Sequence, residues 1–298
     1  MVTGIIDVGS NTVRLSIYRL ENGGSFKLLL SKKIVAGLAS YVTDGALGQE
    51  GIEKLYKCLK EFRSIVTSLE VSAVRAFATA SLRYVRNAKA VVSSMYNETG
   101  LLLEIINGEE EAHLSFMGAR YSTGIENGVV VDLGGASCEL IREENGIAVG
   151  LTSIPLGCLS LSVGNVDTIF PEPEATENMK AVIKNTMKPA IPLLAKRPET
   201  LCFVGGTARG ASRSFKELHL RANGSFGPEG IDTLIKGFEL RDTATMQAVR
   251  SAAPDRVFTL YAGLLIMREI IQASSADSLL VSKCGIREGY LIDRIIGA

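Results

Sequence analysis

A short sequence pattern occurs twice in this chain, and the distance between its copies constrains the fold more than any other feature. Residues 128–135, Gly-Val-Val-Val-Asp-Leu-Gly-Gly, repeat the pattern of residues 4–10, Gly-Ile-Ile-Asp-Val-Gly-Ser, and the aspartates Asp7 and Asp132 are 125 residues apart. This distance is an ordinary domain length, and 298 residues are enough for two domains. The repeat therefore predicts two similar domains, and we place their boundary in the loop at Gly124, which gives domains 1–124 and 125–298.

The predicted elements follow the same order, βββαβαβα, in both halves. Runs of β-branched and apolar residues predict strands, and apolar residues at helical spacing predict helices. Leading strands of this kind pair antiparallel and the later ones join through helical crossovers, so we expect an α/β fold with two mixed sheets covered by helices and a shared cleft. The first half is expected to have strands at 3–8, 13–20, 25–35, 71–78 and 101–106 and helices at 52–69, 86–97 and 109–120. The second half is expected to have strands at 128–132, 138–143, 147–154, 201–204 and 278–282, and helices at 173–194, from 207, at 256–273 and from 286.

Composition excludes several classes of function. The chain has 32 basic and 32 acidic residues, and this zero net charge argues against a nucleic-acid partner. Its 5 cysteines are scattered without a C-x-x-C pair, and no apolar run is long enough to cross a membrane, so we expect a cytoplasmic protein with reduced thiols and no membrane partner. Only 2 histidines are present, His113 and His219, which excludes a histidine metal cage. Catalysis must then use carboxylates, hydroxyls, arginines and backbone amides, and His113 is expected at or near the surface.

Two loops carry the repeated segment, and both suit a phosphate. Loop one is residues 7–12, where Gly9 lets backbone N–H groups approach an anion, Ser10 and Asn11 can donate hydrogen bonds, and Asp7 can hold Mg²⁺. Loop two is residues 132–139, which repeats this design and adds a second acid, Glu139. The alternative for loop one alone is an ordinary hairpin turn.

A third loop ends a strand and opens a helix. It consists of Gly205, Gly206 and Thr207, and the free N–H groups of a helix N-terminus favour an anion there. The same residues are as often a tight strand-to-helix turn. The chain has no G-x-G and no P-loop motif, which excludes those dinucleotide and nucleotide sites.

Charged residues after two other strands are further candidates. Glu109, Glu110 and Glu111 lie in the first turn of a predicted helix, where the helix dipole alone favours acids. One of them could face the cleft as a base, and spacing does not say which. Arg83 and Arg86 follow a predicted strand and are cleft candidates, although such arginines are usually solvated.

These segments together resemble the exopolyphosphatase and guanosine pentaphosphate phosphohydrolase family, within the superfamily of actin, Hsp70 and sugar kinases. The matching residues run in order from 4 to 297. They are 6–14 (IDVGSNTVR), 79–83 (TASLR), 107–112 (NGEEEA), 132–140 (DLGGASCEL), 155–157 (PLG), 205–209 (GGTAR) and 285–289 (GIREG). The resemblance implies two RNase H-like domains of the actin type.

The resemblance also implies roles for single residues. Glu111 matches the base that prepares water, Arg83 matches an arginine that grips phosphate, and Asp132 and Glu139 match acids that organise Mg²⁺ and water. Asp7 is expected to join them at the metal. The expected phosphate contacts are Gly9, Ser10, Asn11, Arg14, Gly134, Gly135, Ala136, Ser137, Gly205, Gly206 and Thr207.

This chain departs from the family pattern in two ways. Ala136 and Cys138 stand where members usually have glycine and threonine, which weakens the expected phosphate contacts. Longer members also carry a C-terminal helical extension, which is not part of this sequence. We therefore do not expect processive handling of long polyphosphate. Family members often dimerise, which makes a homodimer a further expectation.

The implied activity is Mg²⁺-dependent release of terminal phosphate from polyphosphate or a guanosine pentaphosphate-type nucleotide, by direct attack of water. An actin-like ATPase or sugar kinase is one alternative, which explains all three loops but not Glu111 or residues 79–83. A non-catalytic alarmone or nucleotide sensor is the other. Phosphate release measured on a panel of substrates separates these alternatives.

Overall fold

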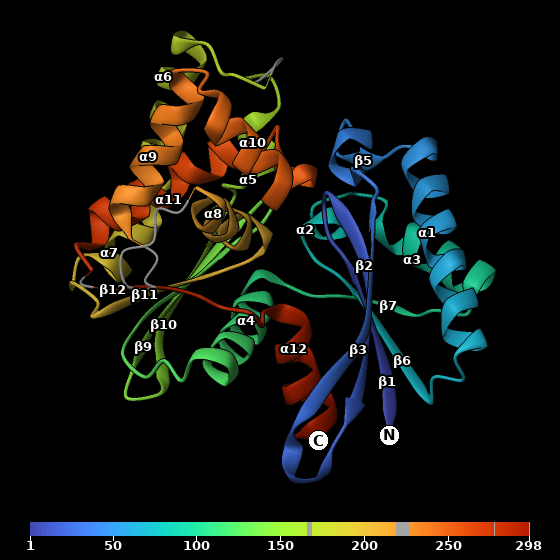
Figure 1. Cartoon of the computed structure of the whole chain (residues 1–298). Coiled ribbons are helices and arrows are strands. Elements are labelled where there is room, and N and C mark those ends of the chain that lie inside the picture. The colour runs from blue at the N-terminus through green and yellow to red at the C-terminus, as the bar shows by residue number, and fades with distance from the viewer. Residues whose placement is uncertain (166–168, 219–226, 277, 298) are drawn as a thin grey trace. The chain divides into compact units, whose positions relative to one another are not determined.

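The computed structural model describes residues 1–165, 169–218, 227–276 and 278–297 (Figure 1). The chain divides into two compact units, Met1–Glu111 with Tyr290–Ala298, and Ala112–Gly289. Each unit contains one five-stranded sheet, and the two sheets have the same topology. His219 lies outside the described residues.

Unit 1 is built on a sheet in the order β3-β2-β1-β6-β7. β1, β2 and β3 are antiparallel, whereas β6 and β7 run parallel to β1. Val8 lies opposite Ala78, and Ala78 lies opposite Ile105, so the carboxyl ends of the three parallel strands meet at one edge of the sheet. The strands are β1 (Val2–Val8), β2 (Thr12–Leu20), β3 (Phe26–Val35), β6 (Ala73–Ala78) and β7 (Leu103–Ile105).

The helices of unit 1 pack on this sheet through their apolar stripes. α1 (Gln49–Ser68) buries Leu55, Leu59 and Phe62, and Figure 1 shows it beside α3 (Ala88–Thr99). The sequence did not predict the short helix α2 (Ala80–Arg83) or the small hairpin of β4 (Val42–Thr43) and β5 (Ala46–Leu47). α4 (Gly108–Thr123) begins in this unit.

Unit 2 repeats the arrangement in the order β10-β9-β8-β11-β12. β8, β9 and β10 are antiparallel, and β11 and β12 run parallel to β8. The predicted order βββαβαβα is therefore confirmed in both units. The strands are β8 (Gly128–Leu133), β9 (Cys138–Glu144), β10 (Ile147–Ile154), β11 (Thr200–Val204) and β12 (Ser278–Val281).

The helices of unit 2 differ most from the expectations. The prediction of a single helix over 173–194 was wrong. α6 (Pro173–Thr186) is followed by a short 3₁₀ turn and then by α7 (Ile191–Leu194). The helix is interrupted because Pro189 and Pro192 lack the N–H that a continuous helix needs. The sequence also missed α5 (Cys158–Ser162), α9 (Pro228–Glu239) and α10 (Thr243–Ala252). The predicted helices α8 (Gly206–Glu217), α11 (Leu260–Ser274) and α12 (Ile286–Leu291) are present, although α11 starts later than expected.

The units change within α4, whereas we expected the boundary at Gly124. The buried face of this helix, including Ala112, Phe116 and Ala119, packs in a cluster with residues of β8, β9 and β11. The helix therefore belongs mostly to unit 2. The chain returns to unit 1 at Tyr290. The ring of Tyr290 stacks on that of Phe77 in the same unit, with 5.0 Å between the ring centroids.

Close backbone contacts explain the two glycines of the segment 285–289. A Cβ on Gly118 of α4 would lie 2.2 Å from the carbonyl oxygen of Gly285, and one on Gly289 would lie 1.7 Å from that of Leu114. Backbones approach so closely here that no side chain fits. This motif therefore joins α4 to α12 and is not itself evidence of a ligand.

The described helices include none that combines the length and the apolarity of a membrane span. All 5 cysteines are free thiols, and all except Cys284 are buried. His113 is exposed, as predicted.

Candidate active site

One group of candidate site residues lies at the carboxyl edge of the unit 1 sheet. Loop one follows β1, residues 79–83 follow β6, and residues 107–111 follow β7. Hydrogen bonds connect these segments: the Ser81 hydroxyl donates to the carbonyl of Val8 at 2.6 Å, and the Ile106 amide donates to the carbonyl of Ala78 at 2.9 Å. Three of the segments that resemble the family therefore meet at this edge.

Loop one is held in its shape by its own backbone and by the segment after β3. The Gly9 amide donates to the Thr12 carbonyl at 3.0 Å, which closes a tight turn. The Asn11 carbonyl accepts from the amides of Ala36 and Gly37, both at 2.9 Å, and the Ser10 side chain is buried. The loop is indeed a turn between two strands, and its conformation is fixed before any ligand arrives.

Arg83 and Glu111 form the most enclosed ion pair at this edge. Arg83 Nη1 lies 2.7 Å from Glu111 Oε2, and the two side chains are only 10% and 12% exposed. The same nitrogen donates to the Ile106 carbonyl at 3.2 Å. Burial lowers the pKa of Arg83, but Glu111 and Tyr84 together raise it by more, so the guanidinium stays charged. The pair presents a cation and a carboxylate side by side in a partly desolvated place.

The structure separates the three glutamates that the sequence left equivalent. The Glu110 amide donates to Asn107 Oδ1 at 2.9 Å, and Glu110 Oε2 accepts from the Asn107 amide at 3.1 Å, which is a capping box. Glu110 also pairs with Arg294 at 3.3 Å, and Glu109 is exposed. Glu110 therefore closes the start of α4, and Glu111 is the glutamate that faces Arg83.

The other charged candidates of unit 1 lie in different surroundings. Asp7 and Arg14 are direct cross-strand neighbours on β1 and β2. Arg14 Nη1 donates to the Ser31 hydroxyl at 3.2 Å. Arg86 donates to the carbonyl of Asp44 in the β4–β5 turn, so its guanidinium stabilises that turn.

In unit 2, two acids occupy adjacent strands at the equivalent position. Asp132 on β8 lies directly opposite Glu139 on β9, in the register that pairs Asp7 with Arg14 in unit 1. Residues opposite one another in an antiparallel pair share a face, so both carboxylates belong to the same side of the sheet. The Glu139 side chain is buried and accepts a hydrogen bond from the Ser153 hydroxyl at 2.8 Å.

Asp132 has a polar environment of its own. The Ser115 hydroxyl donates to Asp132 Oδ2, and the charges of Arg209 and Arg287 act on the same carboxyl. Burial raises the pKa of Asp132, and the serine and the two arginines lower it by less. A cation bound here would favour the charged carboxylate.

Loop two is held by the start of α5. The Gly134 amide donates to the Ser137 carbonyl at 3.0 Å, and the Gly135 carbonyl accepts from the Leu159 amide at 2.8 Å. A Cβ on Gly157 would lie 2.2 Å from the carbonyl carbon of Gly135, which explains the Pro-Leu-Gly segment as a close backbone contact. Loop two, like loop one, is therefore preformed.

The departures from the family pattern at loop two differ in their exposure. Ala136 is partly exposed, and Cys138 is fully buried. Burial raises the pKa of Cys138 well above its ordinary value, with smaller contributions from Glu139 and Asp132. The thiol is therefore neutral and acts as a small apolar residue.

The third loop is shaped by two glycines and an arginine that the sequence analysis missed. Gly205 has a φ of 103°, and a Cβ there would lie 2.8 Å from the Leu133 carbonyl. A Cβ on Gly206 would lie 2.0 Å from Arg256 Nη2, so this guanidinium covers the glycine directly. Arg256 Nη1 also donates to the Thr207 hydroxyl at 3.2 Å.

The Thr207 side chain is used inside the protein. It is fully buried, and its hydroxyl donates to Cys158 Sγ at 3.3 Å. Arg256 is therefore the accessible polar group at this helix N-terminus, with 17% of its side chain exposed. No local motif marks it, because it lies about 50 residues downstream of the glycines and comes to them only through the fold.

The acids do not form a complete metal cage. In residues 1–165, 169–218, 227–276 and 278–297, no group of three or more histidine, cysteine, aspartate or glutamate side chains is arranged to hold a metal ion. Mg²⁺ is typically bound by one or two carboxylates together with substrate phosphates and water. The pair of Asp132 and Glu139 fits that kind of site.

Comparisons with known proteins agree with the sequence segments. Residues 16–296 match the family model described as the Ppx/GppA phosphatase family. Exopolyphosphatase 1 of Mycobacterium tuberculosis (strain H37Rv) is 28% identical over 99% of this chain and 88% of its own length.

Solved structures have the same fold along the whole chain. An exopolyphosphatase from Cytophaga hutchinsonii superposes with a TM-score of 0.85 at 21% identity, covering 100% of both chains. The Aquifex aeolicus member of the Ppx/GppA family superposes with a TM-score of 0.80 at 24% identity, covering 100% of this chain and 98% of its own. At this level of identity the structures establish the fold alone, an α/β fold with two mixed sheets covered by helices, as predicted from the sequence.

Proposed function

We propose, from the premise that this chain belongs to the Ppx/GppA phosphatase family, that it releases the terminal phosphate of inorganic polyphosphate by direct attack of water. The family is one of phosphohydrolases, so the chain is an enzyme of that class. Polyphosphate is the favoured substrate because the curated relatives are named exopolyphosphatases. A guanosine pentaphosphate-type nucleotide is the second candidate, since the family description also includes GppA.

One observation carries this proposal: the enclosed pair of Arg83 and Glu111 at the carboxyl edge of the unit 1 sheet. The pair joins residues from two of the matched segments at 2.7 Å, beside the preformed loop one. α/β sheets place their ligands at the carboxyl ends of their strands. An ordinary surface ion pair is far more exposed than 10% and 12%.

The roles follow from the chemistry of these groups. Glu111 accepts a proton from the attacking water, which requires a deprotonated carboxylate. Arg83 offers a planar guanidinium with several N–H donors, which can bind the oxygens of a phosphoryl group as charge builds on them. The Gly9 and Gly134 amides close the turns of loops one and two, so the remaining amides of these loops would be the donors to a phosphate.

We place Mg²⁺ at Asp132 and Glu139 of unit 2, and a role of Asp7 of unit 1 at the metal stays a prediction from the sequence. When bound, the ion neutralises phosphoryl oxygens and lowers the cost of charge in the transition state. The structural support is the cross-strand position of Asp132 and Glu139. The Ser153 and Ser115 hydroxyls donate to these carboxylates and orient them.

A kinase, an ATPase and a sensor are the rival functions. The kinase and ATPase rivals use the third loop for a nucleotide, but do not need the Arg83–Glu111 pair. The sensor would bind the same phosphates without releasing any.

We propose the cytoplasm as the location, because all 5 cysteines are free thiols. The homodimer stays a prediction from the sequence.

The test is orthophosphate release by the purified full chain. Medium-length polyphosphate, guanosine pentaphosphate and ATP are compared with Mg²⁺ and with EDTA. Release from polyphosphate that needs Mg²⁺ and no sugar acceptor supports the proposal. Release only from ATP supports the kinase or ATPase, and binding without release supports the sensor.

A further inference from the structure

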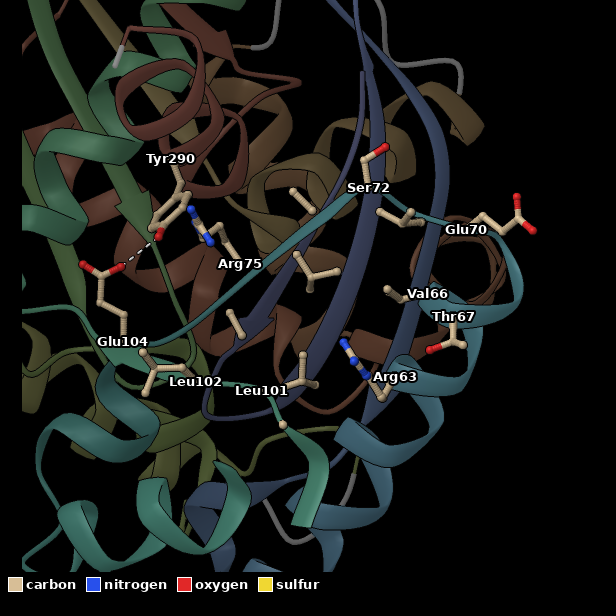
Figure 2. A pocket seen from close by; sticks show the side chains of 15 residues that line it. Arg63, Val66, Thr67, Glu70, Ser72, Arg75, Leu101, Leu102, Glu104 and Tyr290 are labelled. Carbon is tan, nitrogen blue, oxygen red and sulfur yellow. Dashed lines mark hydrogen bonds between the residues drawn. The ribbon is translucent and has the colours of Figure 1, made fainter. Parts of the chain in front are cut away.

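Unit 1 contains a cavity of about 790 Å³ at the edge of its sheet that is opposite the active-site loops (Figure 2). Its lining includes the beginning of β6, the segment before β7, the last turns of α1, and Tyr290. β6 starts at Ala73 in this cavity and ends at Ala78, next to the Arg83 segment. The whole length of a strand therefore separates the cavity from the candidate active site.

The cavity exists because β7 is shorter than the strand it pairs with. β7 pairs with β6 only from Leu103 opposite Ala76 to Ile105 opposite Ala78. Residues 73–75 of β6 have no strand on this side in the described part of the unit, and residues 100–102 line the opposite wall. Backbone groups at such an unpaired edge can hydrogen-bond to a ligand.

Two arginines line the cavity without neutralising partners. Arg63 lies on α1 and Arg75 on β6, and both side chains are exposed. Neither guanidinium makes a hydrogen bond or an ion pair with any residue whose placement the structure describes. A cation in a concave site without an acid to pair with favours an anionic ligand.

The acids in the lining do not cancel these charges at close range. The Glu104 carboxylate already accepts a hydrogen bond from the Tyr290 hydroxyl at 2.8 Å, which Figure 2 shows as a dashed line. The Tyr290 ring is itself fixed by stacking on Phe77. Glu70 extends away from the other lining side chains in the same view. Neither Glu104 nor Glu70 forms an ion pair with Arg75 or Arg63.

Part of the lining is apolar. It includes Val66, Val71, Val74 and Leu101. Figure 2 shows Leu101 between Arg63 and Arg75. These apolar side chains can cover the carbon skeleton of an organic ligand. The volume is within the usual range for small-molecule sites.

We propose that this cavity is a second ligand site, which binds an organic anion with an apolar body. The anionic group, a carboxylate, sulfonate or phosphate monoester, pairs with Arg75 or Arg63, and the apolar body lies against Val74 and Leu101. The site is independent of the phosphohydrolase reaction, because none of its lining residues belongs to the candidate active site.

The experiment titrates the full chain with 8-anilino-1-naphthalenesulfonate, a fluorescent organic anion of this class. We expect saturable binding of one molecule per chain. At least one of Arg75→Ala and Arg63→Ala should weaken binding by about fivefold or more, because the arginine that pairs with the sulfonate makes a charge-assisted contact. Arg19→Ala is the matched control, since Arg19 is an exposed arginine of the same unit outside the cavity.

Two results would overturn the proposal. One is binding that both cavity variants leave unchanged, with folding verified by the thermal unfolding midpoint. The other is displacement of the dye by saturating polyphosphate, which would place the dye at a phosphate site. Arg75→Ala is expected to release phosphate at the wild-type rate, and the binding measurement needs no turnover, so failure here and failure of the proposed reaction are distinguishable.

Discussion

Glu111 and Glu110 are neighbours on α4, and replacing each in turn with glutamine separates catalysis from helix capping. Glu111→Gln keeps the shape of the side chain and an oxygen that can accept from Arg83, but removes the base. Loss of a general base costs about 10² to 10⁴ in rate, which corresponds to roughly 3–5 kcal/mol in the activation barrier. We therefore expect kcat to fall by about 10² to 10⁴ while the KM for polyphosphate changes little.

The same substitution should have only a modest effect on stability. The hydrogen bond between Arg83 and Glu111 is charge-assisted at 2.7 Å, and a neutral amide retains part of it. Exchanging such a bond for a neutral one costs about 1–2 kcal/mol in the free energy of unfolding, or a few degrees in Tm. The rate loss is therefore larger than unfolding can explain.

Glu110→Gln is the matched control, because glutamine also completes a capping box. It should leave kcat within about twofold of the wild type, since neither its Asn107 nor its Arg294 contact involves Arg83. Phosphate release and thermal unfolding are measured on all three proteins. The reasoning is refuted if Glu111→Gln retains more than about a tenth of the wild-type kcat, or if Glu110→Gln loses as much.

Four further outcomes are expected. Arg83→Ala should lower kcat/KM and Arg83→Lys should not restore it, because an ammonium cannot bind two phosphate oxygens as a guanidinium does; equal activity of the lysine variant and the wild type would contradict this. Burial raises the pKa of Glu143 to about 7 from 4.5, so the folded state holds a proton that the unfolded state releases, and the free energy of unfolding should fall as pH rises from about 4.5 to 7. Glu143→Gln should remove this fall and stabilise the protein at pH 8 by up to about 3 kcal/mol, measured by urea unfolding at pH 5 and pH 8; a wild type that gains stability over this range would refute the assignment. Gly118→Ala should destabilise unit 2 by about 1–3 kcal/mol or more, because its Cβ would lie 2.2 Å from the Gly285 carbonyl oxygen, and an unchanged Tm would contradict that contact. Since the net charge is zero, long polyphosphate should be shortened gradually rather than processively, and gels that show only full-length chain and free phosphate would disprove this.

Much of the fold could be predicted because the pattern of apolar residues has a clear period in most elements. The strands of both sheets and the helices α1, α3 and α4 lie within a few residues of their expected ranges. The internal repeat also predicted the shared topology. Prolines at 189 and 192 broke a helix that periodicity alone would continue, and α9 and α10 were missed in a region between clear motifs.

The candidate site was predictable only where a motif is local. The loops at Gly9 and Gly134 and the acids Asp132 and Glu139 are visible as sequence patterns. Choosing Glu111 among three adjacent glutamates needed the family resemblance or the structure, because only tertiary contacts show which one faces Arg83.

Arg256 and the second cavity escaped prediction for a related reason. Arg256 reaches Gly206 from a distant part of the chain, so no spacing rule connects them. The cavity depends on β7 being too short to pair along the whole of β6, and the boundaries of a short edge strand are difficult to read from sequence.

The most direct measurement is orthophosphate release from medium-length polyphosphate by the purified full chain in the presence of Mg²⁺. We predict release that proceeds from the chain ends, is abolished by EDTA, needs no acceptor other than water, and falls by about 10² or more in Glu111→Gln. A folded wild-type protein that binds polyphosphate and releases none would contradict hydrolysis as its function, as would equal release by the wild type and Glu111→Gln.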